Sequence, residues 1–196
     1  MSSLLLLDTK LLFFINQNLA NPFFDIIMPF VTNLNNWRIP ILLIWVLLMI
    51  KGGKKGRVVG ILLILVLIAS DQLSSALIKP LVGRYRPCHL YDNLRLLANC
   101  GGKYAFPSSH ASNISAFAVL FSYFYRKWTA GFILVAIIVG FSRIYVGVHY
   151  PIDVLSGYIV GSCSAFLIIR LYFLGTRIYP AISYQEHNSP HGIGLP

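Results

Sequence analysis

Two histidines, an aspartate and three cations stand at spacings that suit the transfer of a phosphoryl group. His149 and Asp153 are four residues apart, so the carboxylate can reach one nitrogen of the imidazole ring where a helix begins. Such a partner fixes the ring tautomer and makes the other nitrogen a better nucleophile. The alternative is an aspartate that balances the dipole of a helix start beside an unrelated histidine.

A phosphate needs cations, and two of them lie in the segment Lys79-Pro-Leu-Val-Gly-Arg-Tyr-Arg86-Pro. Because Pro80 disfavours helix at the residue before it, we expect a helix to end at Lys79, where a cation suits the helix dipole. Arg143 adds a third cation. Arginine binds phosphate through paired hydrogen bonds, and lysine acts as a point charge. Each basic residue alone is also typical of an anchor at the membrane edge.

A helix start lies between these two segments, at Phe106-Pro-Ser108-Ser109-His110. Proline and serines before an apolar run predict the first turn of a helix. The free N–H groups of such a turn suit an anion of phosphate size, and His110 is a candidate acid for a leaving oxygen. An ordinary helix cap with an interfacial histidine is the alternative.

The composition tells us which elements must position these residues. Of 196 residues, 57% are hydrophobic and 11% are charged, and the net charge is +10. Soluble domains are about 45–50% apolar and about 25% charged, so a soluble domain and a disordered chain are both excluded. The long apolar runs also argue against a nucleic-acid partner. The sequence predicts an all-α, polytopic membrane helical bundle.

We expect about six transmembrane helices in one membrane-embedded domain over 1–178, followed by a flexible cytoplasmic tail over 179–196. The N-terminal part, 1–32, is either an amphipathic segment or the first span. Asn21-Pro22 restarts a helix that runs to about Val31, so the region is either an interfacial helix followed by a span or one bent span. Asp71 lies inside the third span, where it either joins a hydrogen-bond network with Ser74 or Ser75 or tunes the active site. The expected spans are 11–32, 37–50, 57–79, 108–125, 128–147 and 152–174.

Orientation follows from the basic connectors. Residues 51–57 hold four cations, and Arg126 and Lys127 mark a second connector on the same face. The positive-inside rule assigns that face to the cytoplasm, so the three segments above share the outer, periplasmic face. Seven cations then lie outside against the rule, which favours an anion-binding site: Arg38, Lys79, Arg84, Arg86, Arg95, Lys103 and Arg143.

The three segments, read as Lys-x6-Arg-Pro, Pro-Ser-x-His and Ser-Arg-x5-His-x3-Asp, resemble in order and spacing the motifs of the type 2 phosphatidic acid phosphatase superfamily. The superfamily includes membrane lipid phosphatases and soluble vanadium haloperoxidases. One position departs from its pattern, since Ser109 stands where the family usually has glycine. A serine still offers its backbone N–H, but a close approach is harder than for glycine.

The resemblance implies a role for each motif residue. His149 would attack phosphorus and form a phosphohistidine, Asp153 would orient it, and His110 would protonate the leaving oxygen. The phosphate would be bound by Lys79, Arg86, Ser108, Ser109 and Arg143. No metal or other cofactor is implied, and the outer face accordingly carries few carboxylates.

The expected function is hydrolysis of a lipid phosphate in a bacterial inner membrane, with the site facing the periplasm or exterior. Candidate substrates are undecaprenyl diphosphate, lipid A 1-phosphate, phosphatidylglycerol phosphate and phosphatidic acid, with a slight preference for the diphosphate. Alternatives are a non-catalytic transporter or lipid-binding protein that retains the anion site, and a haloperoxidase-like enzyme.

Cys88 and Cys100 lie in the same polar outer loop. In an oxidising compartment they can form a disulfide, and otherwise they are two free thiols.

Overall fold

The computed structural model describes the backbone of residues 3–187 and the side chains of residues 3–176. Within that range the chain is helical and forms no strand, apart from an isolated bridge between Tyr85 and Tyr104. The α-helices are α1 (Ser3–Phe13), α2 (Pro22–Thr32), α3 (Leu34–Lys51), α4 (Gly53–Asp71), α5 (Lys79–Val82), α6 (Ser109–Phe124), α7 (Thr129–Tyr145) and α8 (Pro151–His187).

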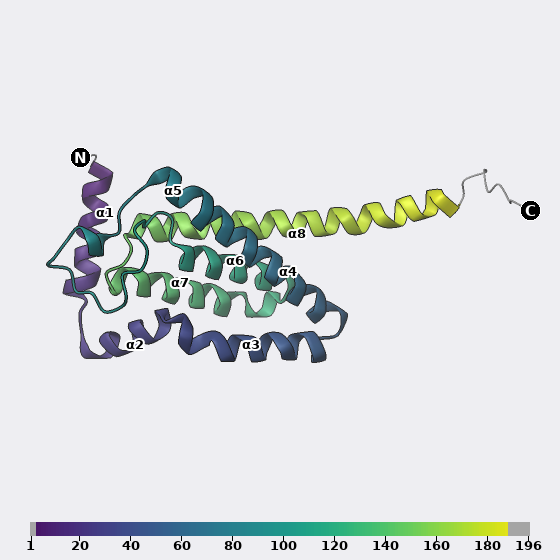
Figure 1. Ribbon diagram of the computed structural model, residues 1–196. Helices are drawn as coiled ribbons and strands as arrows, with labels where there is room; N and C mark the ends of the chain where they lie inside the picture. Colours follow the sequence, from purple (N-terminus) through teal and green to yellow (C-terminus); the bar gives the residue numbers. More distant parts are fainter. Residues whose placement is uncertain (1–2, 188–196) are drawn as a thin grey trace, which may run out of the picture.

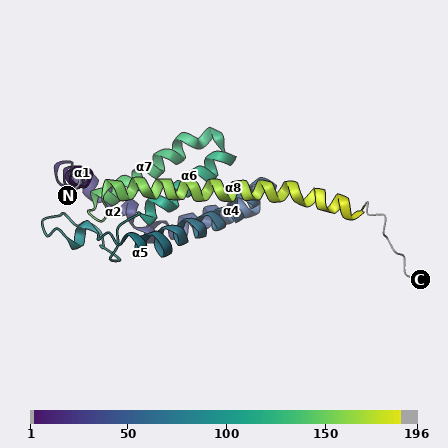
Figure 2. The same cartoon turned by 90° about the horizontal axis from the view of Figure 1, so that it is seen from above.

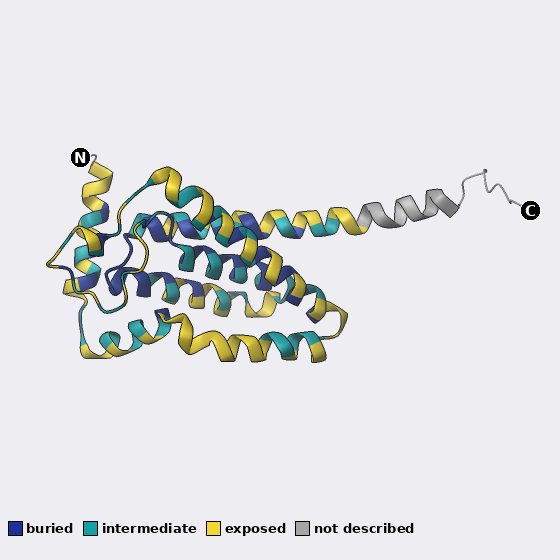
Figure 3. Ribbon diagram, in the orientation of Figure 1, coloured by how far each residue is buried: buried dark blue, intermediate teal, exposed yellow. Residues whose placement is uncertain are grey.

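Long apolar helices make the chain an integral membrane protein. In the part of the chain that the structure describes, four helical stretches are long and apolar enough to cross a bilayer: Leu34–Lys51, Gly53–Val82, Arg126–Tyr145 and Pro151–Thr176. No residue of α3 is buried, although the helix is rich in leucine and isoleucine (Figure 3). Apolar surface of this extent is suited to lipid rather than water. The predicted all-α membrane bundle is confirmed.

Helix α6 is the centre of the bundle, and α4, α7 and α8 pack around it (Figures 1 and 2). Its contact with α8 depends on two glycines. A Cβ atom at Gly157 would lie 2.5 Å from the Ser108 carbonyl oxygen, and one at Gly161 would lie 1.8 Å from the Ser112 carbonyl oxygen. Only glycine permits so close an approach of two backbones, and the two helices are therefore held tightly together.

The N-terminal region has the expected new helix start at Asn21-Pro22, but it does not form the predicted span over 11–32. Helix α1 continues through a π-helical turn, Phe14–Asn18, and the chain then turns before α2 begins at Pro22. The new start is explained by Asn21, whose side chain accepts a hydrogen bond from the Phe24 N–H at 2.9 Å, and by a proline in the first turn. With eleven residues, α2 is too short to span a bilayer. Helix α1 lies across the end of the bundle (Figure 1).

Two helix ends also differ from the predictions. The third span does not stop at Lys79, because a π-helical stretch, Gln72–Ile78, leads into α5, where proline is tolerated in the first turn. Gly83, with a φ of 62°, ends this helix. At the other terminus α8 continues past 178 to His187, and the remainder of the predicted tail, 188–196, lies outside the described residues.

Candidate active site

The predicted site residues meet at one end of the bundle, the end that α1 crosses (Figure 1). They come from the last turns of α5 and α7, from the first turns of α6 and α8, and from the two loops that follow α5 and α7. The site is therefore built almost wholly from helix ends, which places backbone N–H groups and dipoles beside the side chains.

The centre of the site is the pair His149 and Asp153. Nδ1 of His149 lies 3.4 Å from Oδ2 of Asp153, and the two residues are only 1% and 0% exposed. The same carboxylate oxygen accepts the Tyr150 N–H at 2.9 Å. Oδ1 accepts a hydrogen bond from Arg84 at 2.8 Å. Asp153 is thus held from several sides, with one oxygen facing the imidazole ring.

The surroundings of His149 keep its ring neutral. Burial lowers the pKa of His149 well below the usual value of 6.5, and the positive charges of Arg143 and Arg86 lower it further. An imidazole that carries no proton on its second nitrogen has a lone pair available to attack an electrophile. The geometry therefore suits His149 as a nucleophile rather than as a cation.

Backbone contacts join the second segment to the third. The Ser108 N–H donates to the carbonyl oxygen of Asp153 at 2.9 Å, and the Ser108 hydroxyl caps α6 by accepting the Ala111 N–H at 3.5 Å. Ser109 is the first residue of α6. His110 follows, half-buried and near the charges of Arg143 and Arg86.

The first segment contributes two cations whose hydrogen bonds, among the side chains described, go to carbonyl groups. The ammonium of Lys79 donates to the Pro107 carbonyl oxygen. The guanidinium of Arg86 donates to the carbonyl oxygens of Cys100, at 2.7 Å, and Tyr104, at 3.2 Å. Within the described residues neither side chain forms an ion pair with a carboxylate. Their positive charge is accordingly available to an anion.

Arg143 has the same character and is more deeply buried. It is 6% exposed, and its Nη1 donates to the Thr32 hydroxyl at 2.5 Å. Its Nε has no hydrogen-bond partner among the described residues. A buried donor without a partner is costly, and an anionic ligand in the site would supply the missing acceptor.

The sequence did not identify several residues that contact this site. Thr32 closes α2 and bonds Arg143, and no sequence pattern pointed to it. Ser75, which the sequence suggested only as a partner of Asp71, bonds Ser109 at 2.9 Å. Arg84 was noted only as an outer cation, although it bonds Asp153 directly. Asp8 bonds Arg84 at 2.6 Å, and its signal was visible as the one acid in an otherwise apolar N-terminal run.

A disulfide joins Cys88 to Cys100, with the Cα atoms 6.1 Å apart. Together with His89 these residues form the one group of three potential metal ligands within the described part of the chain. Because the two sulfurs are bonded to each other, they are not thiolates that could bind a metal. The bridge instead closes the loop whose Cys100 carbonyl holds Arg86.

A helical membrane bundle with a buried histidine–aspartate pair opposite three cations is an arrangement suited to phosphoryl transfer. The chain belongs to the PAP2 superfamily, whose model matches residues 60–177. That range contains all three sequence segments, and the predicted family resemblance is confirmed. The prediction that the chain is a phosphatase is confirmed at the level of this family.

Individual relatives extend the similarity. The chain is 30% identical over 198 residues to a lipid A 4'-phosphatase from Bacteroides thetaiotaomicron, covering 96% of this chain and 86% of the relative. It is 33% identical over 124 residues to an undecaprenyl-diphosphatase from Sulfolobus acidocaldarius, covering 62% and 59% of the two chains. The crystal structure of LpxE from Aquifex aeolicus superposes with a TM-score of 0.69 at 25% identity, covering 84% of this chain and 95% of that chain.

Proposed function

We propose that this protein is a metal-independent lipid phosphate phosphatase that works through a phosphohistidine. The observation that carries the proposal is the neutral, buried His149, held by Asp153 and faced by Arg86 and Arg143. A nucleophile beside uncompensated positive charge is what attack on an anionic phosphate requires, because the cations offset the repulsion that the phosphate presents.

In the first step Nε2 of His149 attacks phosphorus in line with the bond to the lipid oxygen. The P–N bond forms as the P–O bond breaks, and His110 gives its proton to the departing oxygen. The bound phosphate anion favours the protonated form of His110 against the nearby charges of Arg143 and Arg86. In the second step a water attacks the phosphohistidine while His110 takes up a proton from it. Phosphate leaves and both histidines return to their starting states.

The remaining predicted residues bind the phosphate oxygens. Arg86 and Arg143 present guanidinium groups, and Lys79 presents a point charge. Nε of Arg143, which lacks a partner in the described structure, is available for one oxygen. The hydroxyl of Ser108 and the N–H of Ser109, at the start of α6, supply neutral donors that strengthen as charge develops on the oxygens.

For the substrate we propose a phosphorylated lipid whose head lies at the periplasmic face of a bacterial inner membrane. A lipid A 4'-phosphatase aligns with nearly the whole chain, which makes a lipid A phosphomonoester the first candidate. An undecaprenyl-diphosphatase aligns over a shorter range, so undecaprenyl diphosphate is the second. Phosphatidylglycerol phosphate follows from a phosphatidylglycerophosphatase B of Bacillus subtilis, 31% identical over 120 residues.

The test is phosphate release from these lipids by the full-length protein in detergent micelles. We expect turnover of at least one lipid, complete loss in His149→Ala, and no loss in His187→Ala, a control at the far end of α8. A rapid alkali quench with labelled substrate should trap phosphate label on the protein. Later treatment of the labelled protein with acid should remove it. Activity should survive EDTA.

Other outcomes would favour the alternatives. Turnover that persists in His149→Ala, or that EDTA abolishes and Mg²⁺ restores, would contradict the mechanism. Binding of lipid phosphate without release would favour a non-catalytic protein. Oxidation of bromide by peroxide after addition of vanadate would favour a haloperoxidase-like enzyme.

A further inference from the structure

We infer that Asp8 and Arg84 are positioning residues for the catalytic carboxylate, so that α1 is a working part of the active site. The inference rests on the proposed function, since it concerns the pair Asp153 and His149. Neither Asp8 nor Arg84 belongs to the residues to which the sequence motifs give a role.

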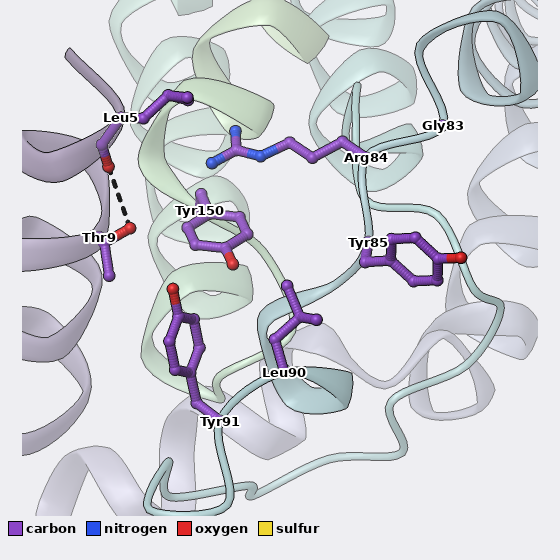
Figure 4. A pocket seen from close by; sticks show the side chains of 8 residues that line it. All are labelled: Leu5, Thr9, Gly83, Arg84, Tyr85, Leu90, Tyr91 and Tyr150. Atoms are coloured by element: carbon purple, nitrogen blue, oxygen red, sulfur yellow. Dashed lines mark hydrogen bonds between the residues drawn. The ribbon is translucent and has the colours of Figure 1, made fainter. Parts of the chain in front are cut away.

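Arg84 bridges two buried carboxylates. Its Nη1 donates to Oδ1 of Asp153 at 2.8 Å, and its Nη2 donates to Oδ2 of Asp8 at 2.6 Å. Its guanidinium carbon lies 3.8 Å from the centre of the Tyr150 ring, and Figure 4 shows the guanidinium stacked there. Two ion pairs and the contact with the aromatic ring fix the orientation of the planar guanidinium.

Asp8 is the residue that completes this arrangement. It is 2% exposed in a helix whose neighbours Leu4 to Leu7 are 41–62% exposed. A buried carboxylate among leucines is costly unless it is paired. Both oxygens are used: Oδ2 accepts from Arg84, and Oδ1 accepts the Ile152 N–H at 2.9 Å in the first turn of α8.

The consequence for Asp153 is that its rotation is fixed. Arg84 occupies Oδ1, and the Tyr150 N–H together with the His149 ring occupies Oδ2. If Asp8 is neutralised, Arg84 loses one of its two ion pairs and is free to move. The Asp153 carboxylate, which Arg84 holds, can then rotate away from the imidazole of His149. Because Asp153 orients the nucleophile, its rotation should lower kcat, which reports the chemical step, more than it raises KM.

The position of α1 agrees with this role. Leu5 and Thr9 of α1 face Arg84 and Tyr150 across a cavity of about 210 Å³ (Figure 4). The Asp8 carboxylate thus joins α1 to the site by hydrogen bonds, and Leu12, one turn further along α1, belongs to the same apolar cluster as Tyr150 and Val154.

The experiment compares Asp8→Asn, Arg84→Gln and the double variant with Asp25→Asn in the full-length protein. Asp25→Asn is the matched control because it breaks an Arg95–Asp25 ion pair of the same 2.6 Å length. We expect kcat to fall about 10-fold in Asp8→Asn and further in Arg84→Gln, with KM within about 2-fold. The double variant should match Arg84→Gln alone, since the two residues act as one unit.

Rescue variants separate orientation from folding. Asp8→Glu, which keeps the charge, should recover part of the rate, and Arg84→Lys, which keeps the charge but not the fork, should remain slow. Arg84→Lys also serves if Arg84→Gln does not fold. The test requires that the wild type is active and His149→Ala is inactive. The inference is then overturned if Asp8→Asn has the same kcat as Asp25→Asn. It is also overturned if the effects of Asp8→Asn and Arg84→Gln on kcat are additive in the double variant. An inactive wild type would instead overturn the proposed function.

Discussion

The hydroxyl oxygens of Ser75 and Ser109 lie 2.9 Å apart, and Ser75 also donates to Oδ1 of Asp71 at 3.1 Å. Since Ser75 has a single proton, which it gives to Asp71, Ser109 donates to Ser75. This chain of bonds joins the π-helical end of α4 to the first residue of α6 and gives the intramembrane Asp71 a partner. The network predicted for Asp71 therefore ends at Ser109, a residue of the proposed phosphate site.

Ser75→Ala should reduce catalysis more than stability. The change frees the Ser109 hydroxyl at the start of α6, so we expect kcat/KM to fall by about 3- to 10-fold, as for loss of one hydrogen bond near a charge. Ser70→Ala is the control, because Ser70 bonds Ser112 at 2.7 Å between the same two elements but away from the motif residues. Both variants are compared by phosphate release and by thermal unfolding. Equal activity in the two would contradict a role for Ser75 at the site.

Thr32→Val should weaken the hold on phosphate without changing charge. The Thr32 hydroxyl accepts from Nη1 of Arg143 at 2.5 Å, and valine has nearly the same shape but no acceptor. A hydrogen bond to a charged group contributes about 1.5–3 kcal/mol, so kcat/KM should fall by about 10-fold or more. The measurement is steady-state kinetics beside Thr176→Val, whose hydroxyl bonds the Phe173 carbonyl of its own helix, α8. Kinetics that match this control would show that Arg143 needs no help from Thr32.

Reduction of the disulfide should lower both stability and activity. A loop of this size is stabilised by about 3 kcal/mol when it is closed, and the Cys100 carbonyl accepts from Arg86. The double variant Cys88→Ser/Cys100→Ser should therefore unfold at lower temperature and bind substrate less well. Alkylation without reductant, followed by mass spectrometry, tests the bridge itself. Full alkylation of both cysteines in the active protein would contradict it.

The acid limb of the pH profile should lie below pH 6.5. Burial and the nearby cations lower the pKa of His149, so the neutral ring that attacks phosphorus persists to lower pH than in a free histidine. Because this pKa is lower in the folded protein, His149 binds its proton at higher pH in the unfolded chain. The free energy of unfolding should therefore fall as the pH drops below 6.5. The measurement is kcat/KM from pH 4.5 to 8, with the ionisation of the substrate phosphate, near pH 6, determined separately. If the acid limb of kcat/KM reports an enzyme group with a pKa at or above 6.5, the expectation of a neutral His149 is contradicted.

The fold was predictable wherever the chain carries a periodic or compositional signal. Apolar length predicted the long helices, and Pro151 marked the start of α8. The N-terminal region was predictable only in part, because polar residues interrupt the run over 11–32 and two separate helices fit it as well as one bent span. Its division depends on a local cap at Asn21, which competes with a continuous span. The end of the third span was misjudged at Pro80, since a proline in the first turn of a new helix does not stop it.

The site was predictable where its residues share a local spacing. His149 and Asp153 are four residues apart, and their contact follows from one helical turn. Asp8 and Arg84 are 76 residues apart, and Thr32 and Arg143 are 111 apart. Such contacts depend on how helices pack, and a single sequence carries no periodicity that reports them.

The close contact of α6 with α8 divides the molecule into a fixed part and a replaceable part. Gly157 and Gly161 hold these helices together, and the bond from Ser108 to Asp153 fastens the second segment to the third. The part of the proposed phosphate site that α6 and α8 supply is therefore preformed. Helix α3 lies outside that unit, has no buried residue, and is free to diverge. An enzyme of this design can be retargeted, in evolution or in the laboratory, by exchanging its periphery while the catalytic end is left intact.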